Sequence, residues 1–562
     1  MKKITVQTKN LVVLFVMLLG SVLPAMAIDF EVDGIAYNVI GENEVEVTAR
    51  DSVKYTGDVV IPATVVQDGV IYHVTRIGTY AFMGCREMST VDIPEGVTSL
   101  SNGAFNACTM LEGIDLPNSL VSIGKLAFWG CSGLTQFHVP RNLTDIAYNA
   151  FMACYNIAYF SCSSLNPRFK AVNGILYTKD LTMLYAYPPG ATATTFEIPS
   201  TVTKLFDYCF GFNHYLERVN IPETVTWMGM NIFRECTKID SIYIPDGVTH
   251  MGVTVFGNCY NLTSVHLPAS LDTIYSSTFL NCSSLTEVTV PRNVSHLDDL
   301  SFSYNPAIKK IIFEEGSRLR SIGDQAFREC NALERFDVPS GVDSIGGSCF
   351  YECQSLKTLN LNEGLRVMNT FAIGDCPSMV ECTLPGSLAV VESQFLDCYQ
   401  LKRVKVGDKN STPGTTRIKS HLFFWAKNVE CVELGANVDS LERYALNTPE
   451  KSVKVVISWA AVPPRSSNMF ASFPTAAVLY VPKASLEAYR EAEDWKRFTT
   501  IVPIEDVGDV NGDGFMNISD ATALINHLSA DGPVNAPLAD VNMDGYINIS
   551  DVIALINKLL NE

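Results

Sequence analysis

Phenylalanine recurs along this chain at a fixed step of 23 residues. A first run is Phe82, Phe105, Phe128 and Phe151, a second extends over residues 210–302, and a cysteine follows three residues after most of these positions. A short fixed period is typical of stacked supersecondary units, each of which buries its apolar edge only against the next. The pattern therefore predicts a solenoid, whose long surface favours recognition over catalysis.

Within one unit, residues 77–100, the order of short elements can be predicted. Apolar Val91 and Ile93 flank a polar residue, an alternation that indicates a short half-buried strand. Pro94 ends this strand because proline cannot continue a ladder, and a second extended piece closes the unit. The segment around Phe82 is too short for a regular helix, so we expect a tight helical turn that places this ring in the core.

These recurring isoleucine-glycine, alanine-phenylalanine, cysteine and isoleucine-proline elements resemble the BspA-like subgroup of leucine-rich repeats over roughly residues 72–446. The resemblance implies a β-rich solenoid with short strands and tight helical turns. It also implies a protein of the bacterial surface, since several members of this subgroup act as adhesins. Recognition of a protein or glycan ligand is the expected function of the repeats.

The period breaks between Phe151 and Phe210, where alternating apolar residues around turn signals predict a hairpin-like insertion near residues 155–200. A solenoid needs caps over its terminal apolar faces. Alternation around Asp33 predicts an N-terminal β cap, and a strand, a helix and a tryptophan after residue 477 resemble the usual closing element of the repeat family. The expected domains are a signal peptide (1–27), the N-terminal cap (28–71), the solenoid (72–450), the C-terminal cap (451–504) and a last domain (505–562).

The first residues indicate export. Lys2, Lys3 and Lys9 precede an apolar run at residues 11–19, and a small-residue site ends at Ala27, the pattern of a secretory signal peptide. No later apolar run reaches the ~20 residues of a membrane helix, so we expect a secreted, extracellular or cell-surface-associated protein without membrane insertion. The formal charge of −19 argues against nucleic acid as a partner.

Sixteen cysteines in an exported chain allow disulfides. Turns ~4.8 Å apart would bring adjacent ladder cysteines within bonding reach. Alternatively, a buried thiol acts as a small hydrophobe that donates to backbone carbonyls. Asn213 and Asn305 stand at two ladder positions and favour this second interpretation, because an amide donates but cannot form a bridge. The ladder cysteines are Cys85, Cys108, Cys131, Cys154, Cys236, Cys259, Cys282, Cys330, Cys353, Cys376 and Cys398.

Two oxygen-rich loops near the C-terminus, residues 509–520 and 540–551, repeat one pattern. Oxygen side chains stand at loop positions 1, 3, 5, 9 and 12, and glycine stands at position 6. A hard cation takes six to eight oxygens, with a backbone carbonyl at position 7, so the pattern predicts two calcium ions. The candidate ligands are Asp509, Asn511, Asp513, Phe515, Asn517 and Asp520 in the first loop and Asp540, Asn542, Asp544, Tyr546, Asn548 and Asp551 in the second.

An apolar helix pattern follows each loop, and none precedes the first. The two loop-helix halves are identical at 14 of 20 aligned positions and resemble a type I dockerin. This resemblance implies a small all-α domain that calcium folds and that docks into a cohesin-type domain. The implied contacts at loop positions 10 and 11 are Ile518, Ser519, Ile549 and Ser550. A familiar pair of hydroxyl residues is absent there, and a calcium-stabilised tail without a cohesin partner stays open.

The sequence contains no phosphate loop, zinc-binding helix or nucleophile elbow, so we expect no enzyme and no catalytic residue. The outward strand positions vary in charge and size between units, as a ligand face or an unselected solvated face would. Tyr243 and His266 occupy neighbouring strands in one such column and are the candidate ligand contacts. The prediction is a non-catalytic, adhesin-like binding protein; the alternative is a non-catalytic component of an extracellular polysaccharide-degrading complex.

Overall fold

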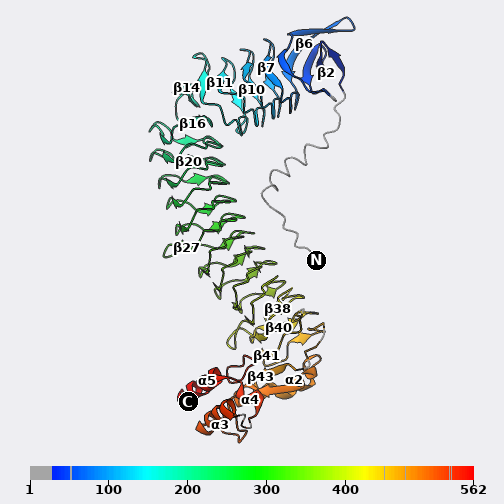
Figure 1. Cartoon of the computed structure of the whole chain (residues 1–562), viewed down its shortest axis with the longest axis vertical. Helices are drawn as coiled ribbons and strands as arrows, with labels where there is room; N and C mark the ends of the chain where they lie inside the picture. Colours follow the sequence, from blue (N-terminus) through cyan, green and yellow to red (C-terminus); the bar gives the residue numbers. More distant parts are fainter. Residues whose placement is uncertain are drawn as a thin grey trace. The chain divides into compact units, whose positions relative to one another are not determined.

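Short parallel strands that pair from turn to turn build this protein. The computed structural model describes residues 28–50, 53–423, 425–448, 450–471, 473–474, 476–530, 532 and 534–561, so the expected signal peptide lies outside the described residues. The chain divides into two units, Met1–Thr194 with Pro199–Leu216, and Thr195–Ile198 with Glu217–Glu562. Each unit is a stretch of β-solenoid (Figure 1).

The first unit begins with an antiparallel β1-β2-β3 sheet, as the alternation around Asp33 predicts. From β3 onward the pairing is parallel through β6, β8, β10 and β12, while β4, β7 and β9 form a second ladder. The strands are β1 (Phe30–Val32), β2 (Ile35–Gly41), β3 (Glu44–Thr48), β4 (Gly57–Val60), β5 (Thr64–Gln67), β6 (Val70–Ile77), β7 (Met88–Asp92), β8 (Ser99–Leu100), β9 (Gly113–Asp115), β10 (Ser122–Ile123), β11 (Gln136–Val139), β12 (Asp145–Ile146), β13 (Tyr159–Cys162), β14 (Phe169–Val172), β15 (Ile175–Thr178), β16 (Met183–Ala186) and β18 (Lys204–Leu205).

The predicted insertion is present. β14 and β15 pair antiparallel around a tight turn at Asn173 and Gly174, whose φ angles of 51° and 80° are both left-handed. Such angles are those of a type I′ hairpin turn, for which asparagine followed by glycine is the preferred pair. The insertion then returns to the repeat through β16, which pairs parallel with β18.

The second unit continues the same parallel pairing, and its outward columns have the register that the sequence predicts, with Tyr243 opposite His266. Its strands are β17 (Thr195–Glu197), β19 (Arg218–Asn220), β20 (Trp227–Met228), β21 (Ser241–Tyr243), β22 (His250–Met251), β23 (Ser264–His266), β24 (Thr273–Ile274), β25 (Glu287–Val290), β26 (His296–Leu297), β27 (Lys310–Phe313), β28 (Ser321–Ile322), β29 (Arg335–Asp337), β30 (Ser344–Ile345), β31 (Phe350–Tyr351), β32 (Thr358–Asn360), β33 (Val367–Met368), β34 (Ile373–Gly374), β35 (Glu381–Leu384), β36 (Val390–Val391), β37 (Arg403–Val406), β38 (Thr416–Ile418), β39 (Cys431–Leu434), β40 (Val438–Leu441), β41 (Val455–Ser458), β42 (Arg465–Ser466), β43 (Val478–Val481) and β44 (Thr500–Pro503).

Helices occur at the C-terminal end of this unit. Tyr489 of α2 and the following Trp495 are both buried with their rings 5.1 Å apart, so the tryptophan packs against the helix. The helices are η2 (Lys483–Ser485), α2 (Leu486–Glu491), η3 (Trp495–Arg497), η4 (Ile504–Asp506), α3 (Ile518–Ala530), α4 (Ala536–Ala539) and α5 (Ile549–Leu560).

The recurring phenylalanines form stacks inside each unit. Ring centroids of neighbours lie 5.0–5.8 Å apart and the ring planes are within 15° of parallel. The backbone is bonded along the same line, because Phe82 donates its N–H to Ala104 and Phe105 donates to Ala127, both at 2.8 Å. Phenylalanines inside a run thus join one turn to the next through both the ring and the amide.

The ladder cysteines complete this contact. The thiol of Cys108 donates to the carbonyl of Phe82 at 3.0 Å, and seven more ladder thiols make the same bond to the previous turn at 2.9–3.3 Å. Asn305 makes it with its amide, to Phe279 at 2.7 Å. All sixteen cysteines are free thiols, and burial raises the pKa of Cys85 to about 11 and that of Cys154 to about 12. These thiols are therefore neutral donors, not reactive thiolates.

The predicted tight turns are present, but most of them contain two residues with left-handed backbone angles. In one turn these are Tyr80 (φ 57°) and Gly84 (φ 71°), and the pair recurs as Thr254 (φ 57°) and Asn258 (φ 63°). The turns close by hydrogen bonds from residue i+3 to residue i, as from Cys85 to Phe82 at 3.1 Å. Left-handed angles are unfavourable for most side chains, so the contacts between turns must hold this conformation.

Removal of one ladder thiol tests this contact. Cys259 is fully buried and donates to Phe233 at 3.0 Å, so Cys259→Ala should lower the unfolding free energy by about 1–2 kcal/mol through the lost bond and a small cavity. Cys259→Ser keeps a donor and should lose less. Urea denaturation measures both, and a serine variant less stable than the alanine variant would contradict the role assigned to the thiol.

Candidate functional site

The first oxygen-rich loop is folded around its own acidic side chains. Asp509 accepts from the backbone N–H groups of Asp513 (3.0 Å) and Gly514 (2.9 Å). Asp520, at the start of α3, accepts from Asn511 (3.1 Å) and Asn517 (2.8 Å). The Asn517 amide also contacts the carbonyl of Phe515 at 3.2 Å. The six residues that the sequence predicts as ligands are therefore brought together in one loop.

The second loop repeats this arrangement nearly bond for bond. Asp540 accepts from Asp544 and Gly545 at 3.0 and 2.9 Å, and Asp551 accepts from Asn542 and Asn548 at 3.1 and 2.9 Å. Asn548 in turn caps α5, accepting from the backbone of Ser550. The two loops thus present the same set of oxygens in the same frame.

The donor set fits a hard cation. Asp520 and Asp551 are fully buried, and Asp540 is 5% exposed. Burial, opposed by hydrogen bonds from Gly545 and Asp544, raises the pKa of Asp540 to about 6, and burial also raises the pKa of Asp551. Buried carboxylates normally need a positive partner, and calcium would supply that charge here.

Part of this site depends on neutral ligands. In the described part of the chain, no three His, Cys, Asp or Glu side chains are grouped so as to hold a metal by themselves. Each loop would add asparagine oxygens and one backbone carbonyl, which suit calcium with its six to eight oxygen ligands better than a transition metal.

The helices after the loops pack against each other and leave apolar residues outside. Val510, Leu524, Val541 and Leu555 belong to a small buried core that the two halves share. Ile518 and Ile549, at the helix starts, are 71% and 66% exposed. The remaining exposed apolar side chains on α3 and α5 are Ile525, Leu528, Ile553, Ile556 and Leu560. An exposed apolar surface of this kind on a small domain is suited to a protein partner.

The Tyr243 and His266 rings stack on the outward face of β21 and β23. Their centroids are 4.5 Å apart and their planes 4° from parallel, and Tyr243 is 53% exposed. Arg218, Asn220, Ser241 and Ser264 line the same open groove of about 490 Å³. The predicted pair therefore lies together as an aromatic platform with polar side chains beside it.

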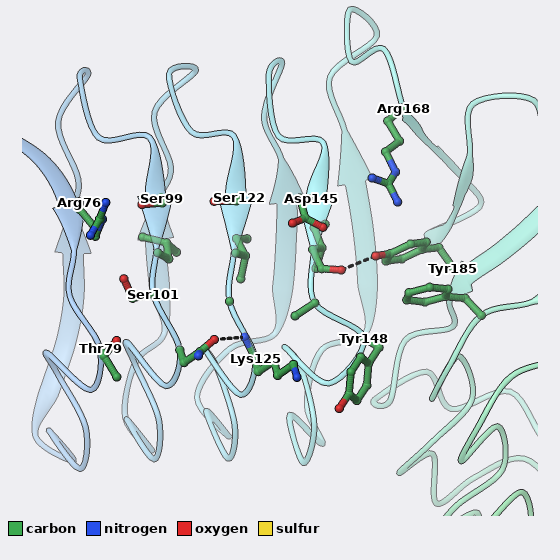
Figure 2. A pocket seen from close by; sticks show the side chains of 17 residues that line it. Arg76, Thr79, Ser99, Ser101, Ser122, Lys125, Asp145, Tyr148, Arg168 and Tyr185 are labelled. Atoms are coloured by element: carbon green, nitrogen blue, oxygen red, sulfur yellow. Dashed lines mark hydrogen bonds between the residues drawn. The ribbon is translucent and has the colours of Figure 1, made fainter. Parts of the chain in front are cut away.

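A second groove, in the first unit, has no counterpart in the sequence predictions. Figure 2 shows Arg76, Ser99, Ser122 and Asp145 in a row on successive strands, with Tyr185 at the end of the row. The row follows the strand register. Tyr185 stacks on Phe206 with centroids 4.1 Å apart and donates to the carbonyl of Ile146.

This groove has a volume of about 640 Å³, within the range of small-molecule sites, ~300–1,000 Å³. Lys125 and Arg168 line it together with Arg76, against Asp145 as the one acidic lining residue. Such a cationic and hydroxyl-bearing lining, in a chain of net charge −19, suits a hydroxyl-rich or anionic ligand. Arg168 and Tyr185 come from the insertion, so the repeat pattern alone could not reveal the groove.

Two protein families match this chain. Residues 70–171, 185–309 and 320–454 match the BspA type Leucine rich repeat region, in six copies, and residues 507–560 match the Dockerin type I domain. Type I dockerin domains bind calcium. A search among curated proteins gives no match, and in the described part of the chain no helix is long and apolar enough to cross a membrane.

Solved structures with similar backbones are bacterial leucine-rich repeat proteins. One from Eubacterium ventriosum is 24% identical and covers 57% of this chain and 93% of its own, with a TM-score of 0.47. One from Bacteroides ovatus is 25% identical and covers 67% and 94%, with a TM-score of 0.39. A cell surface protein from Faecalibacterium prausnitzii is 22% identical and covers 59% and 94%, with a TM-score of 0.35.

The two loops should each hold one ion. Asp520→Asn and Asp551→Asn remove one buried carboxylate from the first and second loop, and each should weaken calcium binding at its own loop about tenfold or more. Isothermal titration of the full chain should then show two sites in the unchanged protein and one tight site in each variant. Glu491→Gln, an exposed change in α2, is the control; two unchanged sites in both loop variants would contradict the ligand assignment.

Proposed function

The chain belongs to the BspA-type leucine-rich repeat proteins and ends in a type I dockerin domain, and on this premise we propose that it is a secreted, non-catalytic, adhesin-like binding protein. The solenoid recognises a protein or glycan, and the dockerin docks into a cohesin-type domain. The proposed limits are those expected from the sequence: signal peptide 1–27, caps 28–71 and 451–504, solenoid 72–450 and dockerin 505–562.

The observation that carries the proposal is the pair of matching loops. In each loop, backbone N–H groups donate to a buried aspartate, Asp520 in one loop and Asp551 in the other. Two calcium ions, one per loop, would supply the positive charge that these carboxylates need. Because binding free energy at such sites becomes folding free energy, calcium would keep the shared core of α3 and α5 intact.

Ile518 and Ser519 in the first half, and Ile549 and Ser550 in the second, are the proposed docking residues. They stand at equivalent helix starts, where both isoleucines are exposed. The exposed isoleucines and leucines farther along α3 and α5 extend each docking face by about three helical turns.

The solenoid's proposed ligand contacts are Tyr243 and His266. A flat stacked pair of this kind can pack against a sugar ring or an apolar side chain, while Arg218 and Asn220 offer donors beside it. Exposed aromatic residues often contribute a large share of binding free energy.

The alternative function, a non-catalytic component of a polysaccharide-degrading complex, is favoured by the groove beside the insertion. Ser99 and Ser122, the ring of Tyr185 and the cationic side chains that line this groove match the hydroxyl and carboxylate groups of an acidic glycan. Oligosaccharide binding at this groove, together with a cohesin on a scaffold that carries glycan-degrading enzymes, would select this function over adhesion.

The docking face can be tested with an immobilised type I cohesin domain. The full chain should be retained in calcium and released by chelator. Ile518→Asp with Ile549→Asp should abolish retention, because a charge at each helix start cannot be buried in an apolar contact. Val462→Asp changes an exposed valine (77%) outside the dockerin and should leave retention unchanged. A chain that binds calcium but no cohesin would instead support the calcium-stabilised tail.

The solenoid contacts can be tested by the double change Tyr243→Ala with His266→Ala. Binding to glycan arrays or to host extracellular proteins should weaken about tenfold or more, while the thermal midpoint should change little because both side chains are exposed. Tyr159→Ala, another exposed outward tyrosine (47%), is the control. Equal binding by the double variant would leave the dockerin as the functional contact and the repeats as a spacer.

A further inference from the structure

The outward face of the last solenoid turns differs from that of earlier turns. Register places Cys431 beside Val455, and Ile457 beside Tyr480, in the outward columns of β39, β41 and β43. The exposed fractions of these four side chains are 1–3%, whereas Tyr243 in an earlier outward column is 53% exposed. An outward column that becomes apolar and buried must be covered by another part of the chain.

The cover comes from the dockerin. Leu538 and Met543, which lie just before and within its second loop, pack against the cluster formed by the outward side chains of β39, β41 and β43. The hydroxyl of Tyr480 donates to the carbonyl of Pro537 at 2.9 Å, and the thiol of Cys431 points to the carbonyl of Met543 at 3.5 Å. In Figure 1, β41, β43 and α4 lie together at this end of the second unit.

A polar contact stands at the edge of the covered area. Tyr546 donates to Glu430 at 2.5 Å and accepts from the Lys454 ammonium at 2.6 Å. The same ammonium lies 4.0 Å from the centre of the tyrosine ring and 3.3 Å from Glu430. Charged hydrogen bonds of this kind are stronger than neutral ones, so this trio fixes the loop on the solenoid.

The first loop provides an internal comparison, because the two loops share one frame. Phe515 takes the place of Tyr546, lacks the hydroxyl and is 74% exposed, against 42% for Tyr546. A Cβ added at Gly545 would lie 3.3 Å from Val455, whereas one added at Gly514 would meet no atom within 4 Å. The close approach to the solenoid is therefore specific to the second loop and is not a consequence of the sequence pattern that the two loops share.

We propose that the second calcium loop is an internal docking surface that seats the dockerin on the last turns of the solenoid, and that calcium in this loop controls the seating. The proposal rests on the proposed calcium-dependent dockerin. Asp544 is a predicted ligand and Tyr546 would give its carbonyl to the ion, so the conformation that holds calcium is the one that presents Met543, Gly545 and Tyr546 to the solenoid. Because the two equilibria are linked, contact between the second loop and the solenoid also tightens calcium binding at that loop relative to the first loop.

The contact between the second loop and the solenoid leaves the proposed cohesin-docking residues exposed. Ile518 and Ile549 stay 71% and 66% exposed with the second loop seated. The chain between the two parts is short, because η4 (Ile504–Asp506) follows β44 directly and leads into the first loop. The dockerin is thus held in a fixed position on the solenoid. A cohesin-type partner bound to it would be held at a defined position relative to the last turns of the solenoid.

The accessibility of the Cys431 thiol shows directly whether the second loop contacts the solenoid, since Met543 covers this thiol and leaves Cys431 only 3% exposed. In the full chain with calcium, alkylation mapped by mass spectrometry should find Cys431 protected. Chelator should expose it, while ladder Cys376, which is buried between turns, should stay protected. In calcium, Tyr546→Ala should raise the alkylation rate of Cys431 about tenfold, and Phe515→Ala, the matched change in the free loop, should not.

Calcium titration of the same samples separates this proposal from the function on which it rests. If two ions bind but Cys431 is alkylated rapidly in calcium, the dockerin does not contact the solenoid as proposed. Equal Cys431 alkylation rates in the Tyr546 and Phe515 variants would contradict the contact in the same way. Either result would leave the proposed calcium-dependent dockerin intact. Protection of Cys431 that persists in chelator would overturn the control by calcium. A chain that binds no calcium at all would overturn the proposed function and this inference together.

Discussion

The contact between one phenylalanine segment and the next is the interaction on which the structure depends. Most such segments carry two left-handed residues, and the carbonyl of the phenylalanine needs a donor inside the solenoid. The thiol three residues after the next phenylalanine supplies a donor for that carbonyl, as Cys131 does for Phe105 at 3.0 Å. Ring stacking, amide bonding and thiol bonding therefore need the same spacing, which explains why the period stays at 23 residues over long runs.

The sequence predicts the elements that depend on local pattern or on period. Strands around Val91, the hairpin at Asn173 and the thiol donors all follow from residue alternation, turn chemistry or the ladder asparagines. It does not predict the left-handed residues, because Tyr80 and Thr254 have no side chain that favours such angles. It also misses contacts between distant segments, such as Tyr185 with the carbonyl of Ile146, or Tyr546 with Glu430, which lies 116 residues earlier. The proposed calcium loops could be recognised in the sequence because all candidate ligands of each loop lie within twelve residues.

The same physical rule accounts for both proposed functional faces. Outward strand positions are mostly polar or aromatic where the solenoid meets solvent, as at Tyr243, and become apolar where another part of the chain covers them, as at Ile457. A rigid core with a freely varied surface suits a recognition scaffold. The C-terminal end departs from this where the dockerin lies on it, so the proposed recognition and docking surfaces lie on different parts of the chain.

Hydrogen–deuterium exchange of the full chain, read by peptide along the repeats, tests the central claim that the phenylalanine segments hold the turns together. The amides of Phe82, Phe105 and Phe256 donate to the next turn at 2.8–2.9 Å, so their peptides should exchange as slowly as those of the strands β7 and β25. The loop at residues 409–413, outside any strand, should exchange quickly. Phenylalanine segments that exchange as fast as that loop would contradict this account and would leave the strands alone to hold the fold.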